Sequence, residues 1–192
     1  MIRINTGIFA AGAIGTMGIL YLMPESVTGW NKSSLSFKNL FGKWKDNVVA
    51  GPVFDKDNWF LNYAAHPYCG AVYYMDARSV GYNAIYSFLH CVGMSTFMWE
   101  YGIEAFAEIP SINDLIITPI AGSIIGELFY LIKREIAQND WEIFNSKIIG
   151  HTITFLIDPI NEIANLLVPE KSASNLILQP NYVGLEIKWQ IP

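Results

Sequence analysis

Apolar positions along this chain gather into long uncharged blocks, and the first runs from Ile4 to Pro24 between Arg3 and Glu25. A helix of this length covers roughly 30 Å, the thickness of the hydrocarbon core of a bilayer. Small residues recur in this block and again in a later one: Gly7, Ala11, Gly15 and Gly18, then Gly122 and Gly126. Such spacing lets neighbouring helices approach closely in a membrane. We therefore expect a retained, packed membrane helix, with a cleaved secretory signal as the alternative.

Two further helices are predicted, over about Tyr82–Phe106 and about Leu115–Glu135. Pro110 ends the first of them. Ser111, followed three residues later by Asp114, resembles a capping box that begins the next helix. Because the connection is this short, the two helices should pack antiparallel.

A short helix and an interrupted fourth apolar stretch complete the predicted bundle. Proline suits a first helical turn, whereas the residue before it avoids the helical region, so His66 marks the start of a helix over about Pro67–Ala77. This helix is too short to cross a bilayer and should lie half-inserted or inside the bundle. The fourth stretch, Ile148–Val168, is broken at Asp158-Pro159.

Two segments differ in character from these blocks. Residues 25–58 interleave lysines with aromatic side chains: Lys32, Lys38, Lys43, Lys45 and Lys56 with Trp30, Phe37, Phe41 and Trp44. This pattern indicates an interfacial segment at headgroup depth, with an ordinary surface loop as the alternative. Residues 182–189 alternate apolar and polar positions, which predicts a short strand or extended arm.

The expected fold is thus an all-α, membrane-embedded or membrane-associated bundle of about four main helices plus short helices. One helical membrane domain covers residues 1–170, and a short extended C-terminal tail covers residues 171–192. Composition supports this fold, because 52% of the 192 residues are hydrophobic and only 15% are charged, against about 25% in soluble domains. A net charge of −5 argues against nucleic-acid binding, and two cysteines cannot form a disulfide framework.

Carboxylates inside the apolar helices are the main functional signal, because ionisable groups at membrane depth are costly unless paired, hydrated or neutral. Glu100 and Glu104 are four residues apart and would share one helix face. The candidate catalytic residues are His66, Glu100, Glu104, Asp114 and Glu127, and the candidate substrate-binding residues are Arg78 and Tyr73. In the structural alternative, carboxylates reach water at a helix end or pair with Arg78, Lys133 or Arg134.

Metal binding and cofactors stay open at this stage. One histidine and two acids from separate helices could supply the three protein ligands of a catalytic zinc site. No H-E-x-x-H or E-x-x-H spacing is present, however, and neither a phosphate-binding loop nor a dinucleotide fingerprint occurs. The sequence therefore names no metal and no cofactor.

Many short motifs together resemble an uncharacterised bacterial envelope family, domain of unknown function 3943. They are Met23-Pro24-Glu25-Ser26-Val27-Thr28 with Trp30, Gly51-Pro52 with Asp55 and Asp57, Asn62-Tyr63, His66-Pro67 with Gly70, Tyr73, Tyr74, Ala77 and Arg78, Trp99-Glu100-Tyr101 with Glu104, Pro110-Ser111 with Asp114, Thr118-Pro119 with Gly122, Gly126 and Glu127, and Asp158-Pro159. The resemblance spans roughly residues 20–165. It implies a place in the cell envelope and supplies no reaction.

Three functional hypotheses follow. The first is an integral envelope membrane protein that acts as a structural, assembly or partner-binding module with a buried polar network. Its partners would be the lipid bilayer and either an envelope protein or a second copy of itself. The alternative is a membrane-embedded enzyme, a metal-dependent or acid–base hydrolase or transferase that acts on a lipid or lipid-linked substrate. An ion or proton path is the third, and the choice between inner and outer membrane stays open.

Overall fold

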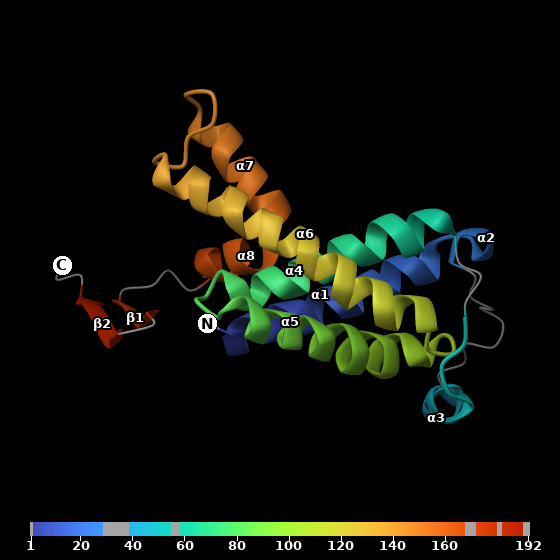
Figure 1. Cartoon of the computed structure of the whole chain (residues 1–192). Coiled ribbons are helices and arrows are strands. Elements are labelled where there is room, and N and C mark those ends of the chain that lie inside the picture. Colours follow the sequence, from blue (N-terminus) through green and yellow to red (C-terminus); the bar gives the residue numbers. More distant parts are fainter. Residues whose placement is uncertain (1, 29–38, 55–57, 168–171, 180–181, 190–192) are drawn as a thin grey trace.

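The computed structural model describes residues 2–28, 39–54, 58–167, 172–179 and 182–189, and it is helical as far as Leu167 (Figure 1). In chain order the elements are α1 (Ile2–Leu22), α2 (Glu25–Thr28), α3 (Leu40–Ala50), the π-helix η3 (Leu61–Ala65), α4 (His66–Arg78), α5 (Ala84–Gly93), the π-helix η4 (Met94–Ile103), the 3-10 turn η5 (Glu104–Phe106), α6 (Ile112–Gln138), α7 (Lys147–Ile157), α8 (Pro159–Leu167), β1 (Ser172–Gln179) and β2 (Tyr182–Trp189). The predicted all-helical bundle is therefore confirmed for the body of the protein.

Local signals placed several helix ends correctly. The Ser111 hydroxyl accepts a hydrogen bond from the Asp114 backbone N–H at 3.1 Å, which is the predicted cap of α6. The fourth apolar stretch divides into α7 and α8 at Asp158, directly before Pro159, as predicted. Both results follow from local chemistry, since a cap and a proline act on the residues beside them.

The predicted helix over about Pro67–Ala77 is confirmed as α4, which begins at His66, but the expectation that His66 avoids the helical region is wrong. The backbone of His66 is itself helical, with φ −61° and ψ −46°, and η3 leads directly into α4. The missing N–H of Pro67 falls where π-type hydrogen bonding changes to α-type bonding, so the chain passes the proline without a break. A second π-helix interrupts the predicted helix at 82–106, where α5 gives way to η4.

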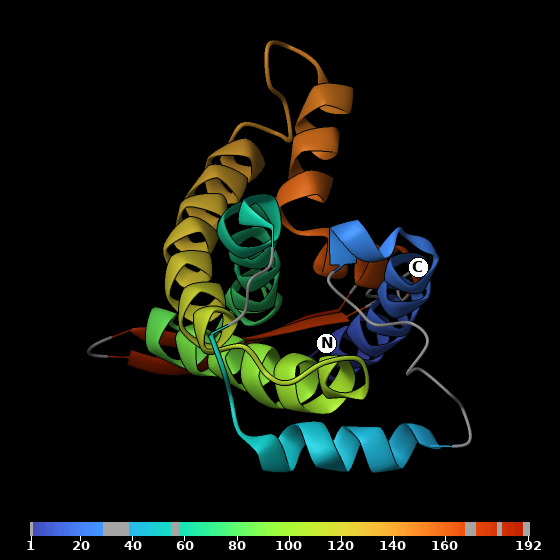
Figure 2. The same ribbon diagram turned by 90° about the vertical axis from the view of Figure 1, so that its right-hand side faces the viewer.

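The bundle is centred on α4 and α6, which lie side by side in Figures 1 and 2. A Cβ atom added at Gly70 would lie 2.0 Å from the Thr118 carbonyl oxygen, and one at Gly122 would lie 2.5 Å from the Gly70 backbone. The small residues at Gly122 and Gly126 therefore serve helix packing, as predicted. Helix α5 also packs on α6, but these glycines face α4.

The glycine stripe of α1 contacts nothing in the described part of the chain, contrary to expectation. A Cβ atom added at Gly7, Gly15 or Gly18 would meet no atom within 4 Å. Helix α1 packs instead through Asn5 and Phe9, which lie on the opposite side of the helix because two residues correspond to a rotation of about 200°.

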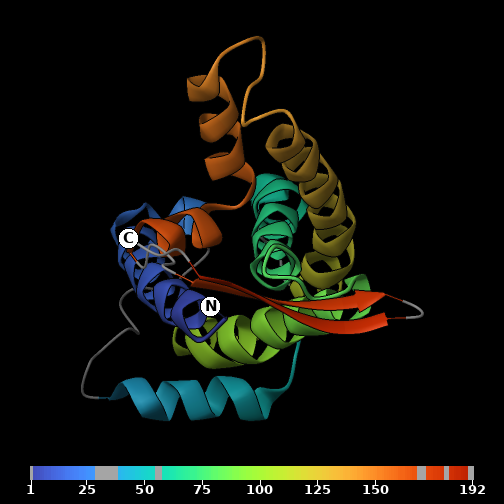
Figure 3. The same ribbon diagram turned by 90° about the vertical axis from the view of Figure 1, so that its left-hand side faces the viewer.

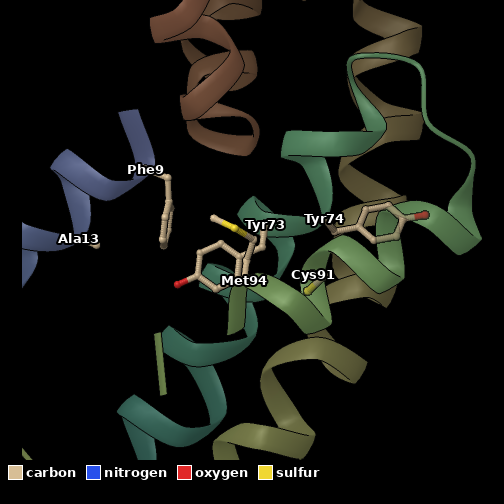
Figure 4. Packing of buried hydrophobic residues seen from close by; sticks show 6 residues of the cluster. All are labelled: Phe9, Ala13, Tyr73, Tyr74, Cys91 and Met94. Atoms are coloured by element: carbon tan, nitrogen blue, oxygen red, sulfur yellow. The ribbon is translucent and has the colours of Figure 1, made fainter. Parts of the chain in front are cut away.

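Contacts of that opposite face join α1 to the bundle. The ring of Phe9 lies edge-on against Tyr73, with centroids 4.8 Å apart, and Asn5 Nδ2 donates to Asn161 Oδ1 at 2.7 Å. Figure 4 shows the buried cluster around them, in which Tyr73 and Tyr74 point to opposite sides of α4. Asn5 is fully buried, and its bond to Asn161 satisfies the amide nitrogen, whereas Asn5 Oδ1 has no hydrogen-bond partner among the described residues.

Two helices are long and apolar enough to cross a membrane, over Ile4–Leu22 and Ile112–Gln138. Only 17% and 22% of their most apolar windows are buried. The outer face of α6 exposes a row of large aliphatic side chains: Ile116, Ile120, Ile124, Leu128 and Leu131. Signal sequences and the core helices of soluble proteins can have the same length and composition, but a core helix is mostly buried.

Part of the predicted interfacial segment forms α3, which lies alongside η4 and η5 in Figure 2. Trp44 Nε1 donates to the Tyr101 carbonyl at 2.8 Å, and Asn47 Nδ2 donates to the Ala105 carbonyl at 2.9 Å. Several of the predicted interfacial side chains lie outside the described residues: Trp30, Lys32, Phe37, Lys38 and Lys56. The alternating segment at 182–189 forms β2, which pairs antiparallel with β1 (Figure 3).

Candidate metal centre

Three of the predicted site residues come together from three separate elements. His66 begins α4, Glu100 lies in η4, and Asp114 lies in the first turn of α6. Each offers one ligand atom, and these atoms all lie within 4.8 Å of one another. His66 Nδ1 is 3.6 Å from Asp114 Oδ1, and the two acids are only 1% and 2% exposed.

Glu100 owes its position to the π-helix. A Cβ atom at Gly102 would lie 2.7 Å from the Phe97 carbonyl oxygen, so glycine permits the close approach of residues five apart in this wider turn. π-Helical turns are rare and occur frequently at functional sites. The expectation that Glu100 and Glu104 could reach water at a helix end is wrong, because Glu104 is only 8% exposed.

The beginning of α6 holds the acids in place. The Ser111 backbone N–H donates to Glu100 Oε2 at 3.0 Å, and the positive end of a helix favours anionic groups such as Asp114. Residues 51–54 lie against the same turn, because the Val53 N–H donates to the Pro110 carbonyl at 3.0 Å. In the opposite direction, the Ile112 backbone N–H donates to the Val53 carbonyl at 2.8 Å. This pairing anchors the turn that leads into α6.

The site is acidic, and Glu100 and Glu104 form no ion pair with a lysine or arginine of the described residues. The buried atoms Glu100 Oε1 and Glu104 Oε2 accept no hydrogen bond from those residues. Burial raises the pKa of Glu100 to about 8. Burial and then the neighbouring Glu100 carboxyl raise the pKa of Glu104 well above its usual value. Buried carboxylates of this kind are stabilised by a bound cation.

The donor set suits a divalent metal ion. One imidazole nitrogen and two carboxylates match the three protein ligands of catalytic zinc sites, which leave another position open. A separation of 3.6 Å between two donors is compatible with metal–ligand bonds of about 2.0–2.2 Å. The Thr118 hydroxyl lies 3.3 Å from His66 Nδ1, so a metal ion bound at this nitrogen would replace that hydrogen bond.

A cavity of about 330 Å³ adjoins this cluster, and both His66 and Glu104 lie in its wall. Most of the remaining wall comes from α1, α4 and α8, and it is largely apolar. Tyr73, a predicted substrate-binding residue, also lines this cavity. The cluster therefore combines buried acid–base groups with a partly open, largely apolar cavity.

Glu127 and Arg78, two other predicted site residues, lie in a separate ion pair. Arg78 Nε donates to Glu127 Oε2 at 2.9 Å, and Arg78 Nη2 donates to Oε1 at 3.1 Å. The Tyr74 hydroxyl donates to the same carboxylate, and the Arg78 guanidinium lies 3.7 Å from the centre of the Tyr130 ring. This geometry is that of a structural ion pair, and it brings neither residue to the cluster.

Asp158 and Glu162 are paired as well. Lys133 Nζ donates to both carboxylates at 2.7 Å, and Ser79 and Asn161 donate to Asp158. Cation pairing, the structural alternative for carboxylates in apolar helices, is thus confirmed for Arg78 and Lys133. Among the described residues, Glu100 and Glu104 form no ion pair with a lysine or arginine. The bundle therefore contains carboxylates that are paired with a cation and carboxylates that are not.

Two neighbours of the site were not identified from the sequence as functional. Thr118 contacts His66, and Glu108 lies in the cavity wall. Thr118-Pro119 belongs to the motifs that carry the family resemblance, so a signal existed for the threonine. For Glu108 the acidic turn at 108–114 gave only a general hint.

Comparison with known proteins adds one finding. A family model described as "Domain of unknown function (DUF3943)" matches residues 51–160. The matched range contains His66, Glu100, Glu104 and Asp114, whereas α1 precedes it. No curated protein and no solved structure matches the chain.

Proposed function

Because the chain belongs to the DUF3943 family, whose description names no activity, we propose a function from the geometry of its site. The protein is a membrane-embedded protein of the bacterial cell envelope that binds a divalent metal ion through His66, Glu100 and Asp114. It acts as a hydrolase or transferase on a lipid or lipid-linked substrate. The observation that carries this proposal is the meeting of three buried ligand atoms within 4.8 Å beside an apolar cavity.

The surrounding side chains have distinct roles in this chemistry. A divalent ion at such a site supplies an activated water or a Lewis acid for a carbonyl or phosphoryl oxygen. Glu104 is buried beside the ligand Glu100 and lies in the cavity wall, so it is positioned to exchange a proton with substrate. The Ser111 backbone N–H holds Glu100 in orientation through its hydrogen bond to Oε2.

Membrane embedding is supported by the uncovered apolar faces of α1 and α6. Ile14 is 70% exposed and Ile124 is 64% exposed, and neither face is covered by another described element. Large exposed apolar surfaces mark contact with a membrane or a protein partner. Helices of this length and composition favour the lipid bilayer as that partner.

Membrane fractionation tests the location. We expect the protein to stay in the membrane pellet after alkaline carbonate extraction, because α1 and α6 would be held by the hydrocarbon core. Sucrose-gradient separation of inner and outer membranes then identifies the compartment. Recovery of a folded monomer in buffer free of detergent and lipid would contradict membrane embedding.

Metal analysis tests the site. Protein purified in detergent without chelators, then reconstituted with Zn²⁺ or Mn²⁺, should hold about one ion per chain. Changing Glu100→Gln should weaken binding by about 100-fold or more, because loss of groups that only support metal ligands already costs 10–100-fold. The matched control is Glu135→Gln, an exposed position on α6. Retention of the ion by the Glu100 variant, or absence of binding by the wild type, would overturn the metal site.

A non-catalytic structural or assembly module is the second candidate function. The ion pairs of Arg78 with Glu127 and of Lys133 with Asp158 favour it, because they join α4, α6 and the start of α8 into one polar framework. A metal ion at the three-ligand cluster would serve that framework equally well. The candidates differ at Glu104, since only the enzyme requires its carboxyl group.

A further inference from the structure

We propose that the cavity beside the metal centre binds a single acyl chain, whose polar end lies at His66 and Glu104. This inference rests on the proposed function and names its substrate class. The cavity has a volume of about 330 Å³, at the lower end of the range of small-ligand pockets. Its shape and its wall chemistry both support an acyl chain.

The cavity is elongated along α1. The lining positions on that helix recur every three or four residues, so they form one face: Phe9, Gly12, Ala13, Thr16 and Leu20. From Phe9 to Leu20 this face covers about 16 Å at 1.5 Å per residue. A cavity lined over this length of one helix can accommodate an extended hydrocarbon chain.

The two ends of the cavity differ. Helices α1 and α4 run in opposite directions (Figure 1), so residues early in α1 lie near residues late in α4. Phe9 packs on Tyr73 with ring centroids 4.8 Å apart, which closes one end with aromatic rings. His66 lies seven residues before Tyr73 on α4, about 10 Å away along the helix axis. The imidazole of His66 is therefore placed away from the contact between Phe9 and Tyr73.

The walls offer an acyl chain little but apolar contact along its length. Besides α1, they include Val72 on α4, Trp99 on η4 and Ile160 on α8. Polar side chains form only a small part of this wall, so it favours a hydrocarbon chain over a sugar, whose many hydroxyl groups would need hydrogen-bond partners. Acidic residues at the polar end also disfavour a free anionic headgroup unless the metal ion neutralises it. An ester or phosphoester would place its polar group next to the metal ion and its hydrocarbon chain along α1, which matches the polar end and the apolar end of the cavity.

Photocrosslinking with the methyl ester of a diazirine-bearing C16 fatty acid tests this placement, because the ester carries no charge. In detergent-purified protein, we expect saturable labelling of cavity-wall peptides that contain Val72 and Tyr73, which excess unlabelled methyl ester removes. Changing Gly12→Phe should lower that labelling at least tenfold, because a Cβ there meets no atom within 4 Å and the ring can enter the cavity. The matched control is Gly18→Phe on the same helix, which does not line the cavity and should label as wild type.

The outcomes separate this inference from the metal site. A thermal melt checks that each variant folds, and Thr16→Phe, another cavity-lining change, replaces Gly12→Phe if that variant does not. Labelling confined to the outward faces of α1 and α6, or equal labelling of the two phenylalanine variants, would overturn the acyl site. Metal content measured on the same samples reports independently: metal without cavity labelling refutes only the acyl site, and cavity labelling without metal refutes only the metal site.

Discussion

One added methyl group at Gly122 is expected to destabilise the protein strongly. In the change Gly122→Ala the new Cβ would lie 2.5 Å from both the Cα and the carbonyl carbon of Gly70, and 2.9 Å from Ala71 N. Backbone atoms cannot rotate away as a side chain can, so α4 and α6 must move apart. Overpacking typically costs about 1–3 kcal/mol, and a clash with backbone falls at or above the upper end.

A loss of about 3 kcal/mol lowers the melting temperature of a chain of this size by roughly 6–12 °C. The measurement is a fluorescence-monitored thermal melt in detergent. Gly93→Ala is the matched control, because its Cβ would meet no atom within 4 Å and alanine has the higher helix propensity. Equal melting temperatures for the two variants would contradict the close α4–α6 contact. His66 and Asp114 lie on these two helices, so Gly122→Ala should also reduce metal binding.

Removing the charge of Lys133 should have an effect of similar size. Its ammonium group is the shared partner of Asp158, whose side chain is fully buried, and of Glu162, which is 21% exposed. The change Lys133→Met leaves two neighbouring carboxylates without their cation. Removing one partner of a buried ion pair costs about 3–5 kcal/mol, because the remaining charge is uncompensated. The melting temperature should fall by about 10 °C.

Two further variants isolate the cause of that loss. Lys45→Met removes an exposed lysine on α3 and should leave the melting temperature within about 2 °C of wild type, as surface changes generally do. Adding Asp158→Asn and Glu162→Gln to Lys133→Met should recover part of the stability, since neutral amides carry no charge to desolvate. A Lys133 variant that melts like the Lys45 variant would show that this ion network does not stabilise the bundle.

The sequence showed which types of side chain the candidate site contains, but it did not show which residues come together there. Carboxylates in apolar helices pointed to Glu100, Asp114 and Glu127 alike, because each carries the same cost at membrane depth. In the structure Glu127 meets Arg78, whereas Glu100 meets His66 and Asp114. The difference depends on which helices face one another, and the spacing of residues along one helix does not contain that information.

Helix type was a second point at which the sequence was insufficient. Regular α-helical spacing predicts that Glu100 and Glu104 share a face near a helix end. The π-helix η4 and the following 3-10 turn change that rotation, and both side chains become buried. A π-turn is stabilised by packing around it as well as by its own residues, so the local pattern gave only the glycine at Gly102 as a hint.

The sequence by itself determined the apolar helices, the cap at Ser111 and the break at Asp158-Pro159. These features depend on hydrogen bonds and steric contacts between residues a few positions apart, and the order of residues specifies such contacts directly. Only the tertiary structure decided that Gly122 contacts a neighbouring helix while Gly15 contacts none of the described residues. It likewise selected the acids that meet a histidine rather than a lysine or arginine, because helix partners are fixed by packing over the whole chain.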